Sequence, residues 1–155
     1  MKKFIISRNI GLTGSGLQTD LRVMVKKARK IAQNFQNNFG ETISVKQLIN
    51  ELSNFIQEFT HSGGVRPFGV SIFIIGFDNF GPNLFQVNPS GSFFKITSGG
   101  IGKNSNIAID FLKRRWSKEL EIQDCIKLGL IALQETSDFS ISKNQIHIGI
   151  IDKNC

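Results

Sequence analysis

The segment THSGGVRPFGVS, residues 60–71, decides the fold because two different hydrophobic patterns meet in it. Before the segment, apolar residues recur every three or four positions, which is typical of an amphipathic helix. After it, residues 70–77 are apolar at nearly every position, as in a strand that is buried on both faces. The segment therefore predicts a corner at which the chain changes from helix to strand.

The residues inside this corner restrict the backbone strongly. Gly63 and Gly64 permit a tight path, whereas Pro67 fixes its own φ angle and limits the conformations of Arg66. Such a corner would display Arg66 and Phe68 to the surroundings. From the residues alone two interpretations stay open: a purely structural corner, or an interface formed by Gly63, Gly64, Arg66, Pro67 and Phe68.

Two helices are predicted before the corner. Gly40 would end the first helix, whose buried face comprises Leu21, Met24, Val25, Ala28, Ala32 and Phe35. Ser44 would cap the second helix while Gln47 reaches back to it, in the capping-box pattern. The buried stripe of this second helix is Val45, Leu48, Ile49, Leu52, Ile56 and Phe59. A strand at residues 4–12 and a glycine-rich turn at residues 13–16 are expected before both helices.

Antiparallel strands and two more helices are predicted after the corner. We expect strands at residues 70–77, 83–87 and 92–97, with turns at 78–82 and 88–91 between them. A third helix follows at about 106–116, capped by Asn104 or Ser105, and a last strand at 145–151 ends the order. Between these two lies a fourth helix, whose apolar face comprises Ile122, Cys125, Ile126, Gly129, Leu130 and Leu133. This order predicts the α+β class, with helices packed on sheet faces, and one domain over residues 1–155.

The composition is that of a globular domain, with 155 residues of which 40% are hydrophobic and 20% charged. No apolar run has the length of a membrane span, and Arg8 and Asn9 interrupt the apolar start too early for a signal peptide. Two cysteines cannot form a disulfide framework. Cys125 is expected to be a reduced core residue and the terminal Cys155 to be mobile, which fits a cytosolic or nuclear compartment.

The net charge of +7 leaves several kinds of partner open. Basic residues cluster at 26–30 and at 113–115, each time within a predicted helix, where a solvated face is the usual explanation. A basic nucleic-acid-binding domain is a second hypothesis from the charge, and it predicts binding that weakens steeply with salt.

The motifs for phosphate and nucleotide binding are incomplete. Gly14-Ser15-Gly16 follows a predicted strand, but Thr19 stands where the dinucleotide fingerprint requires glycine. A turn before a helix that begins near Thr19 or Asp20 explains this stretch better. Gly102-Lys103 is similar to the end of a phosphate-binding loop, but the glycine and the hydroxyl required around it are missing.

Residues for catalysis are equally scarce. The two histidines are His61, in a predicted turn, and His147, in the predicted last strand, and neither has a second ligand at a metal-binding spacing. The chain contains no tyrosine that could act as an acid. We therefore predict no catalytic, cofactor-binding or metal-binding residues.

Five stretches, in this order along the chain, together resemble the proteasome α subunits. They are DLRV at 20–23 with the basic helix after it, the corner at 60–71, NPSGSFF at 88–94, IGKN at 101–104, and FLKRRW at 111–116 followed by ELEI at 119–122. Ser62, before the two glycines, is similar to the residue in the type-2 members of the family. The resemblance extends from Asn9 to Asp152.

This resemblance implies a fold and a role. The fold would be the four-layer α-β-β-α sandwich of the N-terminal-nucleophile hydrolases. Catalysis in that family belongs to β-type subunits with an N-terminal threonine, so an α-type chain would be a non-catalytic, cofactor-free structural subunit of the 20S core. Its partners would be other α subunits in a heptameric ring, β subunits and the regulatory particle. It would support assembly, substrate entry and regulator docking in ubiquitin-dependent protein degradation, in the cytoplasm and nucleus.

The sequence also departs from the family. Counterparts of the family's gating tail, first helix, two further strands and terminal helix are missing, and Ile96-Thr97 replaces a Trp-Lys pair. A chain truncated at both ends is expected to scaffold a ring rather than to form its gate; a fragment, a gene-model error and a reduced subunit all stay open. A third hypothesis is a divergent N-terminal hydrolase in which processing exposes Thr13 or Thr19.

Overall fold

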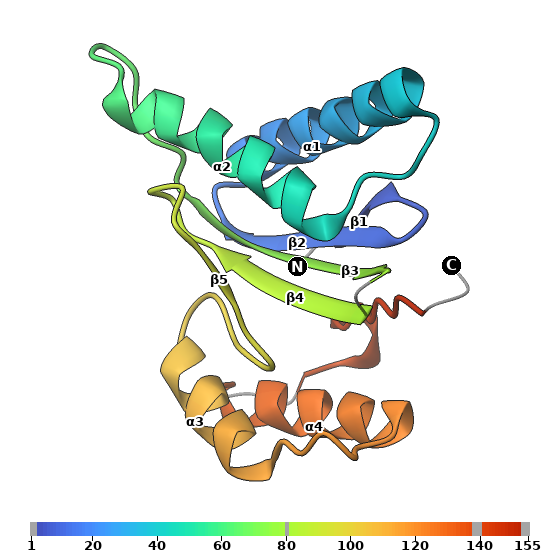
Figure 1. Ribbon diagram of the computed structural model, residues 1–155. Helices are drawn as coiled ribbons and strands as arrows, with labels where there is room; N and C mark the ends of the chain where they lie inside the picture. The colour runs from blue at the N-terminus through green and yellow to red at the C-terminus, as the bar shows by residue number, and fades with distance from the viewer. Residues whose placement is uncertain (1–2, 80, 138–140, 153–155) are drawn as a thin grey trace. The chain divides into compact units, whose positions relative to one another are not determined.

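The computed structural model describes residues 3–79, 81–137 and 141–152, and it confirms the α+β class (Figure 1). The described residues divide into two compact units. The first unit comprises the chain up to Lys95 together with the segment from Ile148 to Asp152, and the second unit comprises Ile96 to His147. Of the two sheets in the expected four-layer sandwich, the described residues contain one, and it lies in the first unit.

That sheet is antiparallel throughout, and its strands lie side by side in sequence order. The strands are β1 Lys3–Ser7, β2 Ile10–Gly16, β3 Val70–Asp78, β4 Gly81–Val87 and β5 Phe93–Lys95. The predicted meander of three strands after the corner is confirmed as β3, β4 and β5, although β5 is shorter than the expected strand at residues 92–97. β3 pairs with β2 across the whole length of β2, so the two helices between them form an excursion from the sheet.

The start of the chain corrects one prediction. The single strand at residues 4–12 and the turn at residues 13–16 are wrong, because the chain reverses in between and β1 and β2 form a hairpin. Two hydrogen bonds join the reversal at Asn9 to Phe77 in β3. The Asn9 side chain donates a hydrogen bond of 2.9 Å to Phe77 O, and Phe77 N donates one of 3.0 Å to Asn9 O. The predicted glycine-rich turn is therefore the second half of β2.

β3 is buried on one face rather than on both, which corrects a second prediction. The buried positions alternate with positions that are only half-buried: Val70, Ile72 and Ile74 are buried, and Ser71, Phe73 and Ile75 are half-buried. The buried positions belong to the core under the helices. A continuous apolar run therefore did not by itself establish that both faces are covered.

The predicted turns of the meander have different outcomes. The turn at residues 88–91 is confirmed by a hydrogen bond of 2.9 Å from Gly91 N to Asn88 O, and the left-handed backbone of Gly91 suits it. The turn predicted at residues 78–82 includes Phe80, which lies outside the described residues, and its Gly81 and Pro82 already belong to β4.

Two helices cover one face of the sheet, α1 Gln18–Phe39 and α2 Val45–His61 (Figure 1). Their predicted buried faces are confirmed, with Phe35 and Phe59 partly buried at the margin of the core. Gly40 ends α1 with φ of 73°, and Ser44 and Gln47 form the predicted capping box of α2. Each fully buried aliphatic side chain in this layer contributes about 1.5–3 kcal/mol of hydrophobic stabilisation.

The second unit contains α3 Ser105–Arg115, α4 Ile122–Glu135 and the short 3₁₀ helix η1 Lys143–Gln145. Both α-helices were predicted. Asn104 stands at the N-cap of α3 as expected, but its side chain donates to Thr136 O at 3.1 Å and does not cap the helix. The apolar face expected on α4 is largely uncovered, since Ala132 is the one buried residue of this helix, whereas Ile122 and Leu133 are exposed.

Other predictions for this part of the chain also need correction. Cys125 is exposed rather than in the core, and Cys155 lies outside the described residues. Residues 146–152 form no strand, although their sequence alternates between isoleucine and other residues. An alternating segment becomes a strand only where a neighbouring strand accepts its backbone hydrogen bonds.

Gly16, at the end of β2, is the position where the backbone tolerates a side chain least. Its φ is 131°, and a Cβ atom there would lie 2.2 Å from Gly69 O. We expect Gly16→Ala to lower the free energy of unfolding by about 2–4 kcal/mol, because strain and a backbone clash add together. Urea unfolding measures this change. Gly63→Ala is the control, since no heavy atom lies within 4 Å of its Cβ position; equal losses for the two variants would contradict the prediction.

Candidate functional site

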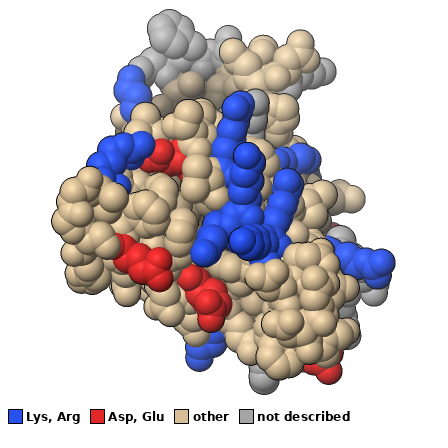
Figure 2. Space-filling view, turned by 90° about the horizontal axis from the view of Figure 1, so that it is seen from above, with Lys and Arg blue, Asp and Glu red and all other residues tan. Residues whose placement is uncertain are grey.

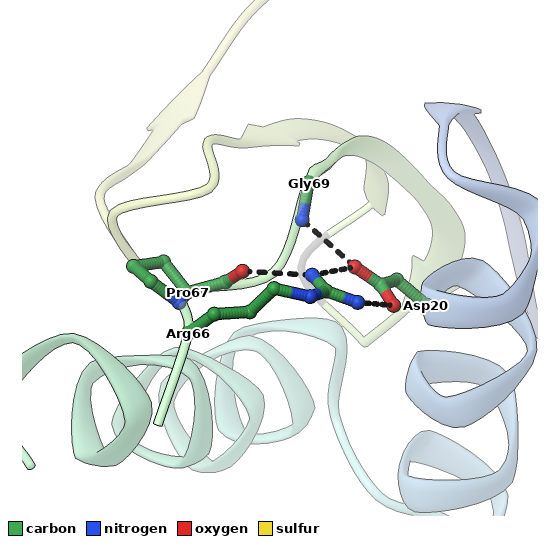
Figure 3. A network of polar contacts seen from close by, with 4 residues as sticks. All are labelled: Asp20, Arg66, Pro67 and Gly69. Carbon is green, nitrogen blue, oxygen red and sulfur yellow. Dashed lines mark hydrogen bonds and ion pairs between the residues drawn. The ribbon is translucent and has the colours of Figure 1, made fainter. Parts of the chain in front are cut away.

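The corner at residues 60–71 is tied to the first turn of α1 by a two-pronged ion pair (Figure 3). Arg66 Nη1 donates to Asp20 Oδ2 at 2.7 Å, and Nη2 donates to Oδ1 at 2.8 Å. Gly69 N donates to the same Oδ2 at 2.9 Å, and Arg66 Nη1 also donates to Pro67 O at 3.0 Å. The carboxylate therefore receives donors from both ends of the Arg66–Gly69 segment.

The local sequence explains why Asp20 is available for this role. The N-cap of α1 is Leu17, which has no side-chain cap, and Leu17 N instead donates to Gly69 O at 2.9 Å. Asp20 lies in the first turn, where the helix dipole favours a negative charge. The expectation that a helix begins near Thr19 or Asp20 is confirmed, since α1 begins at Gln18, while the Asp20 side chain turns to the corner.

The surroundings of Asp20 stabilise its charged form. The pKa of Asp20 falls from 3.8 to about 2, chiefly because Arg66 donates hydrogen bonds to the carboxylate and because Gly69 N donates another, while burial opposes the change. The pKa of Arg66 is raised by the same carboxylate. The Asp20 side chain is 7% exposed and that of Arg66 is 62% exposed, so the pair has one buried and one open partner.

Phe68 points into the protein, which corrects the prediction that the corner displays it. It is 8% exposed, and its ring centroid lies 4.6 Å from that of Phe59 and 5.7 Å from that of Phe55. Residues 61–67 are exposed. The corner thus has an aromatic anchor beneath it and an open loop above it, in which Gly63, Gly64, Arg66 and Pro67 are accessible.

The other residues singled out in the sequence lie in ordinary structural positions. His61 is the last residue of α2 rather than part of a turn, and His147 is exposed outside any strand. Thr13 lies in the middle of β2 and Thr19 in the first turn of α1. Lys103 is exposed just before α3.

The described part of the chain contains neither a metal-binding cluster nor a membrane-spanning helix. No group of three or more His, Cys, Asp or Glu side chains is arranged to hold a metal ion. In the same residues, no helix combines the length and the apolar character needed to cross a membrane.

Asp20 is the site residue that sequence reasoning missed. It lies 46 residues before Arg66, so no local pattern connects the two. One signal was present, because Asp20 is the single acidic residue of α1, whereas the same helix carries five basic residues. Asp20, as the lone carboxylate at the start of a basic helix, could have been proposed as the ion-pair partner of Arg66, whose backbone conformation is restricted by Pro67.

Comparison with known proteins gives consistent results. The family profile described as proteasome subunit matches residues 1–151. Similar proteins named proteasome subunit alpha type-2 include those of Dictyostelium discoideum, at 45% identity over 97% of this chain, Oryza sativa subsp. indica, at 47% over 94%, and Drosophila melanogaster, at 41% over 97%. The chain spans 65%, 62% and 64% of the lengths of these relatives.

The lowered pKa of Asp20 predicts a specific dependence of stability on pH. Because the folded-state pKa is the lower one, the stabilisation is complete above about pH 4 and is lost as the pH falls towards about 2. We expect the loss to be at most about 2 kcal/mol, because the Arg66 side chain is largely solvated.

Urea unfolding of the unsubstituted chain and of Asp20→Asn at about pH 5 and about pH 2.5 tests this expectation. The variant should be less stable at the higher pH, and the difference between the two proteins should shrink at the lower pH. A difference that stays constant over this range would contradict the assignment.

Proposed function

The chain belongs to the proteasome subunit family, and from this premise we propose that it is a non-catalytic structural subunit of the α ring of the 20S proteasome. The observation that carries the proposal is the match of the family profile to residues 1–151, together with relatives that are named alpha type-2. The proposed role is to support assembly of the core particle, substrate entry and regulator docking in ubiquitin-dependent degradation. The proposed location is the cytoplasm and the nucleus.

The proposed partners are other α subunits in a heptameric ring, β subunits and the regulatory particle. Two features of the fold support a scaffold role. The helices α1 and α2 pack as a layer on the sheet, with fully buried positions on both helices. The described sheet also has two edge strands, β1 and β5, whose outer backbone groups favour pairing with further structure.

The positions of Thr13 and Thr19 favour a non-catalytic role over that of an N-terminal hydrolase. Thr13 pairs with Phe73 in the middle of β2, so processing that exposes it would remove β1 and the first part of β2. Exposure of Thr19 would remove both strands and the start of α1. Either cleavage would delete strand pairs on which the first unit depends, and for this reason catalysis is assigned to neighbouring subunits.

The corner formed by Gly63, Gly64, Arg66, Pro67 and Phe68 is the proposed contact with a neighbouring subunit. The loop is open, and Val65 within it is 46% exposed. Phe68 anchors the corner from below, while the Asp20 carboxylate binds both terminal nitrogens of the Arg66 guanidinium. A preorganised arginine on a fixed loop suits an interface, because little side-chain entropy is lost on binding.

Native size separation of the endogenous protein, followed by intact mass of the chain in each fraction, tests the proposed function. We expect the protein to travel in a very large complex together with other proteasome subunits. A chain of 17.3 kDa in that complex would show that these residues suffice for assembly, and a heavier one that they are part of a longer protein. A chain that runs alone would overturn the scaffold assignment.

The proposed contact at the corner predicts that Arg66→Ala weakens ring assembly more than Asp20→Asn does. Both variants break the same ion pair, but only the first also removes the side chain that would reach a neighbour. Loss of an interface arginine is expected to weaken association about tenfold or more. Native gels of complexes formed by each variant provide the measurement. Equal assembly of the two variants would show that the corner is structural only.

A further inference from the structure

An arginine of α1 reaches the outer edge of β1. β1 is an edge strand of the sheet, so alternate backbone groups of this strand face away from β2. α1 contacts β1, and Arg29 Nε donates a hydrogen bond of 2.9 Å to Ile5 O. The helix thus places a guanidinium group on the backbone of the edge strand.

The hydrogen-bond pattern of β2 shows that Ile5 O faces outward. Backbone bonds at both ends of β2 fix which of its residues face β3: Phe77 N to Asn9 O, and Leu17 N to Gly69 O. Odd-numbered residues of β2 therefore direct their backbone groups to β3, and even-numbered ones direct theirs to β1. Among the latter is Leu12, which pairs with Phe4. Because Ile5 follows Phe4, its own N–H and C=O point away from the sheet.

Two more features obstruct the same edge. The register between β1 and β2 shifts between Ile5 and Ser7, as in a β-bulge. The side chain of Lys3 donates a hydrogen bond to Ile148 O. Lysines and bulges are devices by which native proteins protect the edges of their sheets. Arg29 differs from both, because it occupies an outward-facing backbone acceptor directly.

The sequence of β1 explains why its edge needs protection. Residues 4–6 are Phe-Ile-Ile, which favour a strand, and Ile5 is 74% exposed. An edge that favours pairing with further structure also favours pairing with another copy of itself. Two identical strands can pair antiparallel about a twofold axis, so that each offers its outward groups to the other.

We propose that Arg29 guards the edge of β1 against pairing with β1 of a second copy of this chain. By binding Ile5 O, the guanidinium group denies that acceptor to an incoming N–H and occupies the place of the partner strand. Any strand that pairs with this edge must first displace Arg29. The inference goes beyond the proposed function, because it concerns the isolated chain and requires no other proteasome subunit.

Sedimentation velocity over a range of concentrations tests the proposal with the full chain, Arg29→Met and the control Arg22→Met. Figure 2, which looks onto the helix layer, shows lysine and arginine side chains gathered on this face. Removing a cation lowers the repulsion between copies, so the control must remove the same charge. Arg22 and Arg29 are both exposed residues of α1. Urea unfolding measures the stability of each protein.

Two labelled peptides report strand pairing itself by fluorescence anisotropy. One has the sequence of residues 3–10, and the other carries Ile5→Pro. Proline removes the N–H that faces the partner strand while leaving an apolar side chain in place.

We expect Arg29→Met to dimerise at concentrations at which the full chain and Arg22→Met stay monomeric. It should bind the unsubstituted peptide about fivefold more tightly than the full chain does, because one backbone acceptor becomes free. An Arg29→Met protein that stays monomeric would overturn the proposal, and a lower stability towards urea would then make the bond a structural tie only. Equal association of both variants would overturn it in favour of charge, and equal binding of both peptides in favour of apolar adhesion.

Discussion

The ion pair between Asp20 and Arg66 joins the two ends of the segment that leaves the sheet after β2, forms α1 and α2, and returns as β3. The rest of the first unit depends on this closure. The chain leaves the sheet at Gly16, forms α1 and α2, and returns at Val70, which pairs directly with Gly16. Closing a loop of this length costs entropy that grows with the logarithm of its length. The carboxylate of Asp20 helps to offset that cost, because it receives donors from Arg66 and from the backbone of Gly69 just before the chain rejoins the sheet.

This closure also explains why the corner combines such different residues. Gly69 brings its backbone oxygen within 2.2 Å of the place where a side chain on Gly16 would begin, so the contact requires glycine at position 16. Phe68 fills the space beneath the corner against Phe55 and Phe59. Arg66 lies on the open side, with both terminal nitrogens of its guanidinium bound to Asp20. One short segment therefore completes the core and presents a cation to the surroundings.

The sequence predicted best what depends on neighbours along the chain. The periodicity of α1 and α2, the stop at Gly40 and the cap at Ser44 are all local, and the structure confirms them. Predictions that depended on distant partners failed more often. An apolar stripe on α4 indicated which face is hydrophobic but not whether anything covers it, and alternation at residues 146–151 could not supply a neighbouring strand. The partner of Arg66 was likewise beyond reach, since it lies 46 residues away.

The return of residues 148–152 to the first unit imposes an order on biosynthesis. Ile151 Cδ1 lies 2.9 Å from the position that a side chain on Gly11 would occupy, and the Lys3 side chain donates to Ile148 O. The β1–β2 hairpin leaves the ribosome before residues 148–152, and these contacts must wait until the whole second unit has been translated. On a stalled or shortened nascent chain the surface around Gly11 stays uncovered. Such chains expose apolar surface around Gly11 that residues 148–152 otherwise cover.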